Sequence, residues 1–290
     1  MKTTKIIESI ENGQEEKNEK TGIHLKFKYS YKKLLSYFII YSILGFVTET
    51  VFGLLTKGVI ESRKSMLYGP FCCIYGLGAI CLIYPPEKKE PKGWYLFFYG
   101  IIIGSLIEYI VSFIGEYIFH IKWWDYSNYP FNINGRICLL FSVFWGLLTV
   151  VLNKLIHPSV DKFIYKLENK IPEKIFNRIL TILLIFIAID LILSCFALKM
   201  FFTRVIYENK IDNVDGVEAY YKEYLNIYQN SKVIKKIVNT LFSDKKMIRT
   251  FPNIKLTLKD GTIIWIKDIL KDIKPYYIKI FEPKDIITLN

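Results

Sequence analysis

The chain has 290 residues, of which 52% are hydrophobic and 16% aromatic, and its mean hydropathy is +0.25. Charged residues make up 23%, an ordinary share for a soluble protein, so the apolar excess must be concentrated in particular segments. The net charge of +12 would favour nucleic-acid binding in a soluble protein. Here Lys and Arg flank apolar runs, which argues for a lipid bilayer as the partner and against nucleic acid.

Neither the cysteines nor the histidines are spaced as metal ligands. The five cysteines lie in apolar runs without a CxxC pair, and the three histidines are scattered at segment edges. A zinc site or a disulfide framework would need regularly spaced loop ligands. We therefore expect packed, unpaired cysteines, no metal and no cofactor.

Five apolar segments are long enough to cross a hydrocarbon layer of ~30 Å, which takes about 20 residues. They cover about residues 34–55, 66–84, 94–119, 137–156 and 175–200. In the second, Gly69, Pro70, Gly76 and Gly78 disfavour a continuous helix. A broken or re-entrant segment is the alternative there, provided that protein or water covers its backbone. The first segment is too long for a signal peptide and is interpreted as a retained membrane helix.

The loop charges predict the orientation of the spans. Lysines are most frequent before the first span, between the second and third, and between the fourth and fifth. This bias places the N-terminus on the cytoplasmic side of the membrane. Five spans then place the C-terminal residues outside, and a re-entrant second segment would reverse their side.

The residues after the last span differ in composition. VEAYYKEYLNIYQN and SKVIKKIVNTLF have helical periodicity, and NIKLTLKDGTIIWI alternates around Asp260–Gly261, which predicts a hairpin with a type I′ turn. PYYIKIF predicts a third strand. The predicted fold is an all-α polytopic membrane helix bundle of about five spans with a small C-terminal α+β soluble module. The predicted divisions are a charged cytoplasmic tail (1–33), the transmembrane domain (34–201) and the module (202–290).

Small and acidic residues share faces of the predicted spans. Stripes of Gly and Ser, including the GxxxG of Gly100 and Gly104, predict closely packed helices. Glu49, Glu108 and Asp190 also lie several residues inside spans, where a charge costs about 2.5 to 3.5 kcal/mol on insertion scales. Such acids pair, bind a cation or line a wet path. Hydrogen-bonded links between helices are the alternative.

Two further stretches carry candidate residues. Tyr68-Gly69 and Tyr75-Gly76 are seven residues apart and would share a helix face, either in a broken helix that lines a substrate path or in a kinked, packed one. The loop HIKWWDYSNYPFNINGR joins two spans. Its aromatic residues fit an interfacial belt, its Asn and Gly fit consecutive turns, and Asp125 and Arg136 could close it as an ion pair.

Three stretches together resemble a known family. YSILGFVTETVFG, MLYGPFCCIYGLGA and EYIVSFIGEYIFHIKWWDYSNYPFNINGRICLLFSVFWGLL are similar to the bacterial membrane family called putative ABC-transporter type IV, over about residues 41–158. The resemblance implies a permease-like role. It also raises Trp124, Asp125, Tyr126 and Arg136 from belt residues to site candidates. No GxxxxGK[ST] occurs in the chain, so an ATPase would be a separate subunit that docks on residues 85–93 and 157–174.

The sequence thus predicts a permease-like component of an ABC-type transport system with no catalytic residues of its own. The candidate transport or binding path comprises Glu49, Tyr68, Tyr75, Glu108, Glu116, Trp124, Asp125, Tyr126 and Arg136. One alternative is a scaffold or sensor of the cell envelope, and another is an intramembrane enzyme that uses Asp125 or Glu116 as an acid or base. The substrate, and whether the chain forms a homo-oligomer, stay open.

Overall fold

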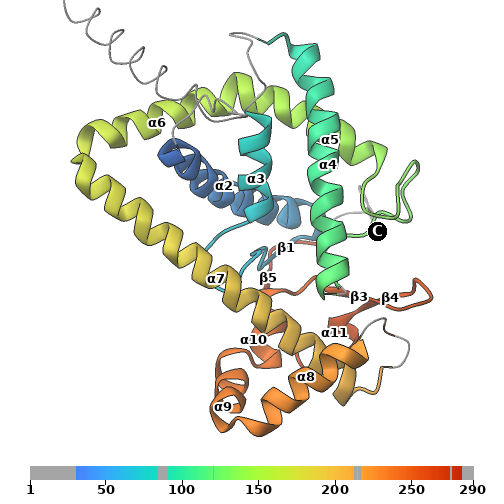
Figure 1. Cartoon of the computed structure of the whole chain (residues 1–290). Coiled ribbons are helices and arrows are strands. Elements are labelled where there is room, and N and C mark those ends of the chain that lie inside the picture. The colour runs from blue at the N-terminus through green and yellow to red at the C-terminus, as the bar shows by residue number, and fades with distance from the viewer. Residues whose placement is uncertain are drawn as a thin grey trace, which may run out of the picture. The chain divides into compact units, whose positions relative to one another are not determined.

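A computed structural model of the chain describes residues 31–83, 91–119, 121–211, 214, 217–274 and 276–282 (Figure 1). Almost all of the predicted cytoplasmic tail, 1–33, lies outside these residues, as do Lys88 and Lys89 of the second loop.

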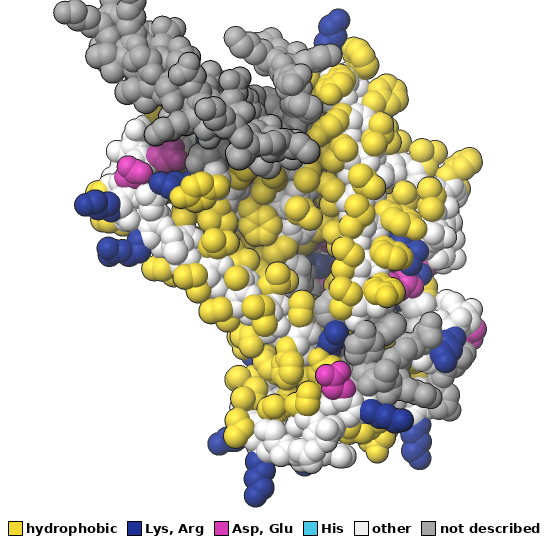
Figure 2. Space-filling model, in the orientation of Figure 1, with side chains coloured by type: hydrophobic (Ala, Val, Ile, Leu, Met, Phe, Trp, Pro, Cys, Tyr) yellow, Lys and Arg dark blue, Asp and Glu magenta, His cyan; other side chains and the backbone are white. Residues whose placement is uncertain are grey.

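Four helical stretches of the described residues are long and apolar enough to cross a membrane. They are α2 (Tyr31–Lys57), α4 (Gly93–Phe119), α5 (Leu139–Val151) continued by a π-helical turn (Leu152–Ile156) and α6 (His157–Lys170), and α7 (Glu173–Glu208). Large apolar side chains are exposed along all of them, for example Val47, Ile102, Leu147 and Ile192. Figure 2 shows hydrophobic side chains gathered over one face of the molecule. This outward apolar surface is what a lipid environment requires.

The second predicted span is not one helix. Only α3 (Cys73–Leu82) is helical, and its 10 residues give a length of about 15 Å, half of the hydrocarbon thickness. The preceding backbone turns at Gly69, whose φ of +73° favours glycine, and at Pro70. Of the alternatives left open for this segment, residues 66–83 therefore show the broken one, and whether the segment crosses the membrane stays a prediction.

Side chains satisfy the irregular backbone before α3. The amide of Leu67 donates to Ser194 Oγ at 2.9 Å, and that of Tyr68 donates to the Asp190 carboxylate at 3.1 and 3.2 Å. The amide of Cys73 donates to Ser65 Oγ at 2.9 Å. Helix α7 and Ser65 thus supply acceptors without which a non-helical backbone would be costly inside a membrane.

Helices α4 and α5 pack antiparallel across their small residues. A Cβ atom built on Gly104 would lie 2.6 Å from Cβ of Trp145, and one built on Gly100 would lie 2.8 Å from the Trp145 carbonyl oxygen. Gly146 allows the same approach from α5, against Phe97. The predicted close packing through glycine stripes is confirmed.

The C-terminal region builds its core on the end of α7. It contains α8 (Val217–Asn230), α9 (Lys232–Leu241), α10 (Asp244–Thr250) and α11 (Ile266–Ile269), so both predicted helices are confirmed. Val238, Phe242 and Met247 are buried in one cluster with Phe201 and Val205 of α7. The predicted division at residue 202 thus falls within α7 and stays a prediction.

Two small antiparallel sheets join the C-terminal region to connections between the apolar helices. In one, β3 (Lys255–Thr257) pairs with β4 (Ile263–Trp265) and with β2 (Ile121–Lys122), which follows α4. In the other, β5 (Tyr277–Lys279) pairs with β1 (Val59–Glu61), which follows α2. The third predicted strand is therefore confirmed, but it pairs with β1 and not with the hairpin.

The hairpin turn differs from the predicted type. Gly261 N–H donates to Leu258 O at 2.9 Å, Leu258 N–H donates to Thr262 O at 2.8 Å, and Gly261 has a φ of +83°. A type I′ turn needs positive φ at both central residues, whereas Asp260 keeps a negative one. The hairpin is confirmed, with a three-residue loop that ends on a left-handed glycine in place of the type I′ turn.

Candidate functional site

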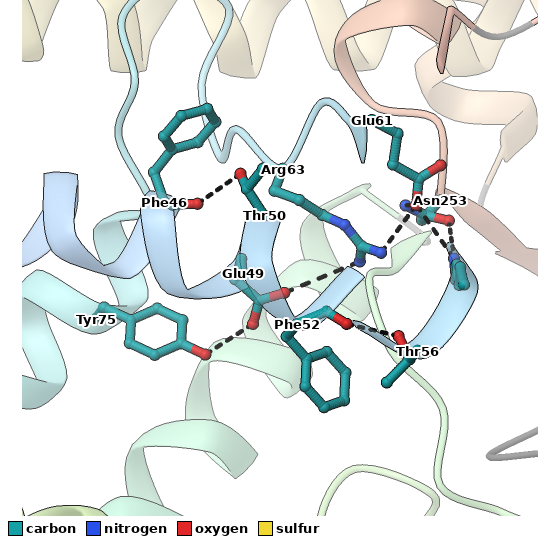
Figure 3. Close-up of polar contacts among 10 residues, drawn as sticks. Phe46, Glu49, Thr50, Phe52, Thr56, Glu61, Arg63, Tyr75 and Asn253 are labelled. Carbon is teal, nitrogen blue, oxygen red and sulfur yellow. Dashed lines mark hydrogen bonds and ion pairs between the residues drawn. The ribbon is translucent and has the colours of Figure 1, made fainter. Parts of the chain in front are cut away.

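The first acid within a predicted span, Glu49 of α2, has a side chain that is 29% exposed and has partners from two other segments (Figure 3). The hydroxyl of Tyr75 on α3 donates to Glu49 Oε1 at 2.7 Å, and Arg63 Nη1 lies 3.9 Å from Glu49 Oε2. Gly45 and Gly53 on the same face of α2 leave room for the Tyr75 ring and the Arg63 guanidinium, respectively. The small-residue stripe of α2 therefore accommodates the partners of its acid.

Arg63 was not among the predicted site residues. It lies in the connection after α2 and folds back along the helix, with a side chain only 16% exposed. Its Nη2 also lies 2.8 Å from Glu61 Oε1, so one guanidinium joins two carboxylates. The sequence offered one signal: an arginine lies a few residues after an apolar run that contains an acid. The local pattern did not predict that the backbone turns back and brings Arg63 beside Glu49.

Glu61 ties this cluster to the C-terminal region. Its Oε1 accepts from Asn253 Nδ2 at 2.9 Å (Figure 3). It also accepts from Lys57 Nζ at 3.2 Å. Burial by itself raises the pKa of Glu61, but the hydrogen bond from Asn253 and the positive charges of Lys57 and Arg63 outweigh it, so the pKa lies below the ordinary value. The glutamate is therefore held as an anion.

The lowered pKa of Glu61 predicts a loss of stability in acid. A carboxyl whose folded pKa is depressed contributes stability that is complete above its unfolded pKa, near 4.5, and is lost as the pH falls through the folded pKa. We expect the melting temperature to fall more steeply below about pH 4.5 in the native chain than in Glu61→Gln. Parallel curves for the two proteins, measured in the same detergent, would contradict this assignment.

The second acid, Glu108 of α4, is 5% exposed and has two hydrogen bonds. Tyr126 Oη donates to its Oε1 at 2.9 Å, and Trp145 Nε1 on α5 donates to its Oε2 at 3.1 Å. Tyr126 comes from the loop after α4 and stacks on Phe141, with ring centroids 4.6 Å apart. Burial and the nearby Glu108 raise the pKa of Tyr126, which keeps the hydroxyl a donor.

An aromatic pair separates the two glutamates. The rings of Tyr75 and Trp145 have centroids 6.2 Å apart, and each ring donates a hydrogen bond to a different acid. The polar contacts therefore run from Arg63 through Glu49 to Tyr75, cross to Trp145, and continue through Glu108 to Tyr126. Of this sequence of side chains, Trp145 was also missed, because a tryptophan within an apolar run is usually only a packing residue.

Asp190 and Tyr68 lie apart from this path. Asp190 is 1% exposed, and its carboxylate accepts from the Tyr68 amide and from Ser194 Oγ, so it serves the irregular backbone of the broken segment. The Tyr68 hydroxyl accepts from Lys246 Nζ of α10 at 3.2 Å. Because Tyr68 precedes α3, the predicted helix face shared by Tyr68 and Tyr75 is wrong.

The loop between α4 and α5 forms a second polar cluster. Arg136 pairs with Glu116 of α4, and its guanidinium lies 5.5 Å from the Tyr109 ring centroid. The indole of Trp124 donates to Arg136 O at 2.9 Å. The ion pair of Arg136 is therefore with Glu116 of α4, and not with Asp125 as suggested from the sequence.

Asp125 instead stabilises the loop itself. Its Oδ1 accepts from Ser127 Oγ at 2.7 Å and lies 4.0 Å from Lys122 Nζ. Asn134 and Gly135 have φ of 53° and 64°, and Arg136 N–H donates to Ile133 O at 3.0 Å, so the predicted turn there is confirmed. Across the described residues, no group of three His, Cys, Asp or Glu side chains could hold a metal ion.

The apolar helices and their buried acids define a membrane protein. The family model described as "Putative ABC-transporter type IV" matches residues 36–195, more than half of the chain, and the chain belongs to this family. The match includes α2 to α5, the loop between α4 and α5, and α7 as far as Asp190 and Ser194. Neither the curated proteins nor the solved structures include a match to this chain.

Proposed function

We propose that this chain is the membrane-spanning, permease-like component of an ABC-type transport system in a bacterial plasma membrane, and that it is not itself an enzyme. The family and the four apolar helices support the membrane role. The observation that carries the transport role is the line of contacts on which Glu49 and Glu108, from two apolar helices, lie on either side of Tyr75 and Trp145.

In this proposal the chain crosses the membrane five times, with a discontinuous second crossing. The Lys32–Glu173 pair, at 3.2 Å, brings the starts of α2 and α7 together, and the bond from Asn153 Nδ2 to Leu82 O, at 3.1 Å, joins the end of α3 to the turn after α5. The β1–β5 and β2–β3 pairs gather the ends of α2 and α4 with the C-terminal strands. Residues 62–83 then return the chain from the side of the membrane where α2 and α4 end to the side where α2 and α7 begin.

The path runs along the broken segment. Discontinuous membrane helices line substrate sites because their backbone and side chains offer polar groups at depth. In this proposal the Tyr75 side chain is the gate between Glu49 and Glu108. The loop cluster forms the outer entrance of the path, the mouth, and consists of Glu116, Trp124, Asp125 and Arg136. With the N-terminus in the cytoplasm, this mouth and the C-terminal region lie outside.

A separate P-loop ATPase supplies the energy in this proposal. Its docking surface is the 157–174 stretch, in which α6 buries Val160 and Ile164 and carries exposed Lys162 and Lys166. Asp161 of α6 pairs with Lys33 of α2 at 2.8 Å, so this surface lies at the cytoplasmic start of α2. The other predicted docking stretch, 85–93, lies mostly outside the described residues.

The path is tested by neutralising its acids. In cells whose uptake or growth depends on the chain, Glu49→Gln and Glu108→Gln are each expected to lower the uptake or growth rate by at least about tenfold. Each substitution removes a carboxylate that stabilises the transition state for transport. The matched control is Glu223→Gln, an exposed acid of α8, which should leave the rate unchanged. Normal rates in both path variants, at equal protein levels, would overturn the polar path.

A non-transporting scaffold or sensor of the envelope is the second candidate. It is favoured by the partners that every buried acid already has, and by the two sheets that join the C-terminal region to the connections β1 and β2. Affinity purification of the full chain from its own membranes separates the two. A stoichiometric P-loop ATPase supports the transport component, and a complex without one supports the scaffold.

A further inference from the structure

A basic pocket lies between the connection after α2 and the short helix α10. Its volume is about 370 Å³, in the range of small-molecule sites. Its wall consists of Phe46, Ser62, Lys64, Ser243, Lys245, Lys246, Arg249 and Thr250. Four of these eight side chains are cationic and none is acidic, so the pocket has a concentrated positive charge.

The nearby acids are engaged elsewhere. Asp244, the neighbour of Lys245, pairs with Arg204 of α7. Glu61, close in sequence to Lys64, lies 2.8 Å from Arg63 Nη2 and also binds Lys57 and Asn253. Asp190 of α7 interacts electrostatically with Lys64, so one carboxylate stands against the four cations and the pocket keeps a net positive charge.

The basic wall is held in place by packing on its other side. Helix α10 buries Met247 and Ile248 in the C-terminal core, which turns Lys245 and Arg249 outward. Thr250 O accepts a hydrogen bond from Ser62 Oγ at 2.7 Å. Lys246 Nζ lies 4.7 Å from the Tyr68 ring centroid. The backbone that carries the cationic residues of α10 is therefore already in place before a ligand binds.

One wall belongs to an apolar helix. Phe46 lies on α2 next to Val47, which is 50% exposed on the surface that faces lipid in the proposed topology. A ligand in the pocket would therefore place its anionic group against the lysines and arginine and an apolar part beside α2. Lys and Arg bind phosphate through short, charge-assisted hydrogen bonds.

We propose that this pocket binds a phosphate group, either in the headgroup of an anionic phospholipid or in a free phosphate-bearing solute. The binding does not depend on the chain being a transporter. Two probes distinguish the sources. Phosphatidylglycerol retained by the full chain is measured by native mass spectrometry against phosphatidylcholine, and glycerol phosphate in solution is titrated calorimetrically into the same preparation.

The test variant is Lys245→Gln with Arg249→Gln, both exposed residues of α10 in the wall of the pocket. We expect it to weaken binding of the phosphate probe by at least about tenfold, because two charge-assisted bonds are lost. The matched control removes two exposed lysines elsewhere, Lys259→Gln with Lys274→Gln, and should bind like the native chain. Equal melting temperatures would show that both variants are folded.

Each outcome decides a point. Retention of phosphatidylglycerol alone assigns the pocket to a lipid headgroup, and saturable binding of glycerol phosphate assigns it to a solute. The proposal is overturned if the native chain binds neither probe, or if the control variant loses as much affinity as the pocket variant.

Discussion

Arg63→Met is expected to lower the free energy of unfolding by about 2 kcal/mol, between the values for exposed and for buried ion pairs, because the cluster is only partly buried. Arg63 is the shared cation of Glu49 and Glu61, whose side chains are 29% and 10% exposed. Without it both carboxylates lose a charge partner, and only Lys57 continues to compensate Glu61. Unfolding of the purified chain in mixed micelles measures the change.

The control for this variant is Arg178→Met, an exposed arginine of α7, which should change the free energy by less than about 0.5 kcal/mol. Adding Glu61→Gln to Arg63→Met should recover part of the loss, because the stranded anion is then removed. If Arg63→Met costs no more than an exposed ion pair, about 1 kcal/mol or less, the cluster in Figure 3 does not stabilise the fold.

Trp145→Ala is expected to cost about 3 to 5 kcal/mol, as for other large aromatic side chains removed from a packed interior. Trp145 is 7% exposed and fills the space left by Gly104 and Gly78. Its indole also donates to Glu108, so the alanine leaves a cavity and removes one of the two hydrogen bonds of a buried acid. The same unfolding experiment in mixed micelles measures the loss.

Trp145→Phe separates the two contributions, since it keeps most of the ring and removes the N–H donor. We expect it to cost less than the alanine variant while lowering transport as Glu108→Gln does. Trp94→Ala, at a position 64% exposed near the start of α4, is the matched control and should have little effect. If Trp94→Ala and Trp145→Ala lower the free energy of unfolding by similar amounts, the packing of Trp145 between α4 and α5 does not stabilise the fold more than an exposed tryptophan does.

The helices with a strong apolar pattern were the most predictable part of the fold. Four of the five expected segments correspond to α2, α4, α5 with its π-helical extension, and α7. The exception is the second expected segment, 66–84, where local rules compete and the alternatives stayed open. Gly69 and Pro70 oppose a helix, and Asp190 and Ser194 of a distant helix supply the acceptors for the non-helical backbone. Nothing in residues 66–84 alone reveals those acceptors.

The candidate site was predicted in its acids and in only some of their partners. Glu49 and Glu108 were recognisable because an acid within a span is costly. Tyr75 and Tyr126 were also chosen, and the structure joins each to one of these acids. Arg63 and Trp145 were missed because their roles depend on where other segments bring them. The same reason explains why Arg136 binds Glu116 and not the closer residue in sequence, Asp125.

The sequence by itself therefore determined the membrane class, the four long helices, the glycine faces and the family. These features are encoded by the local pattern of apolar, small and acidic residues along the chain. Only the tertiary structure decided which cation and which hydroxyl meet each buried acid, that the C-terminal strands pair with the connections after α2 and α4, and that α10 closes a basic pocket. Those contacts join residues far apart in the sequence, as in the bond from Asn253 to Glu61 and the pairing of Val59 with Lys279, and no local pattern encodes them.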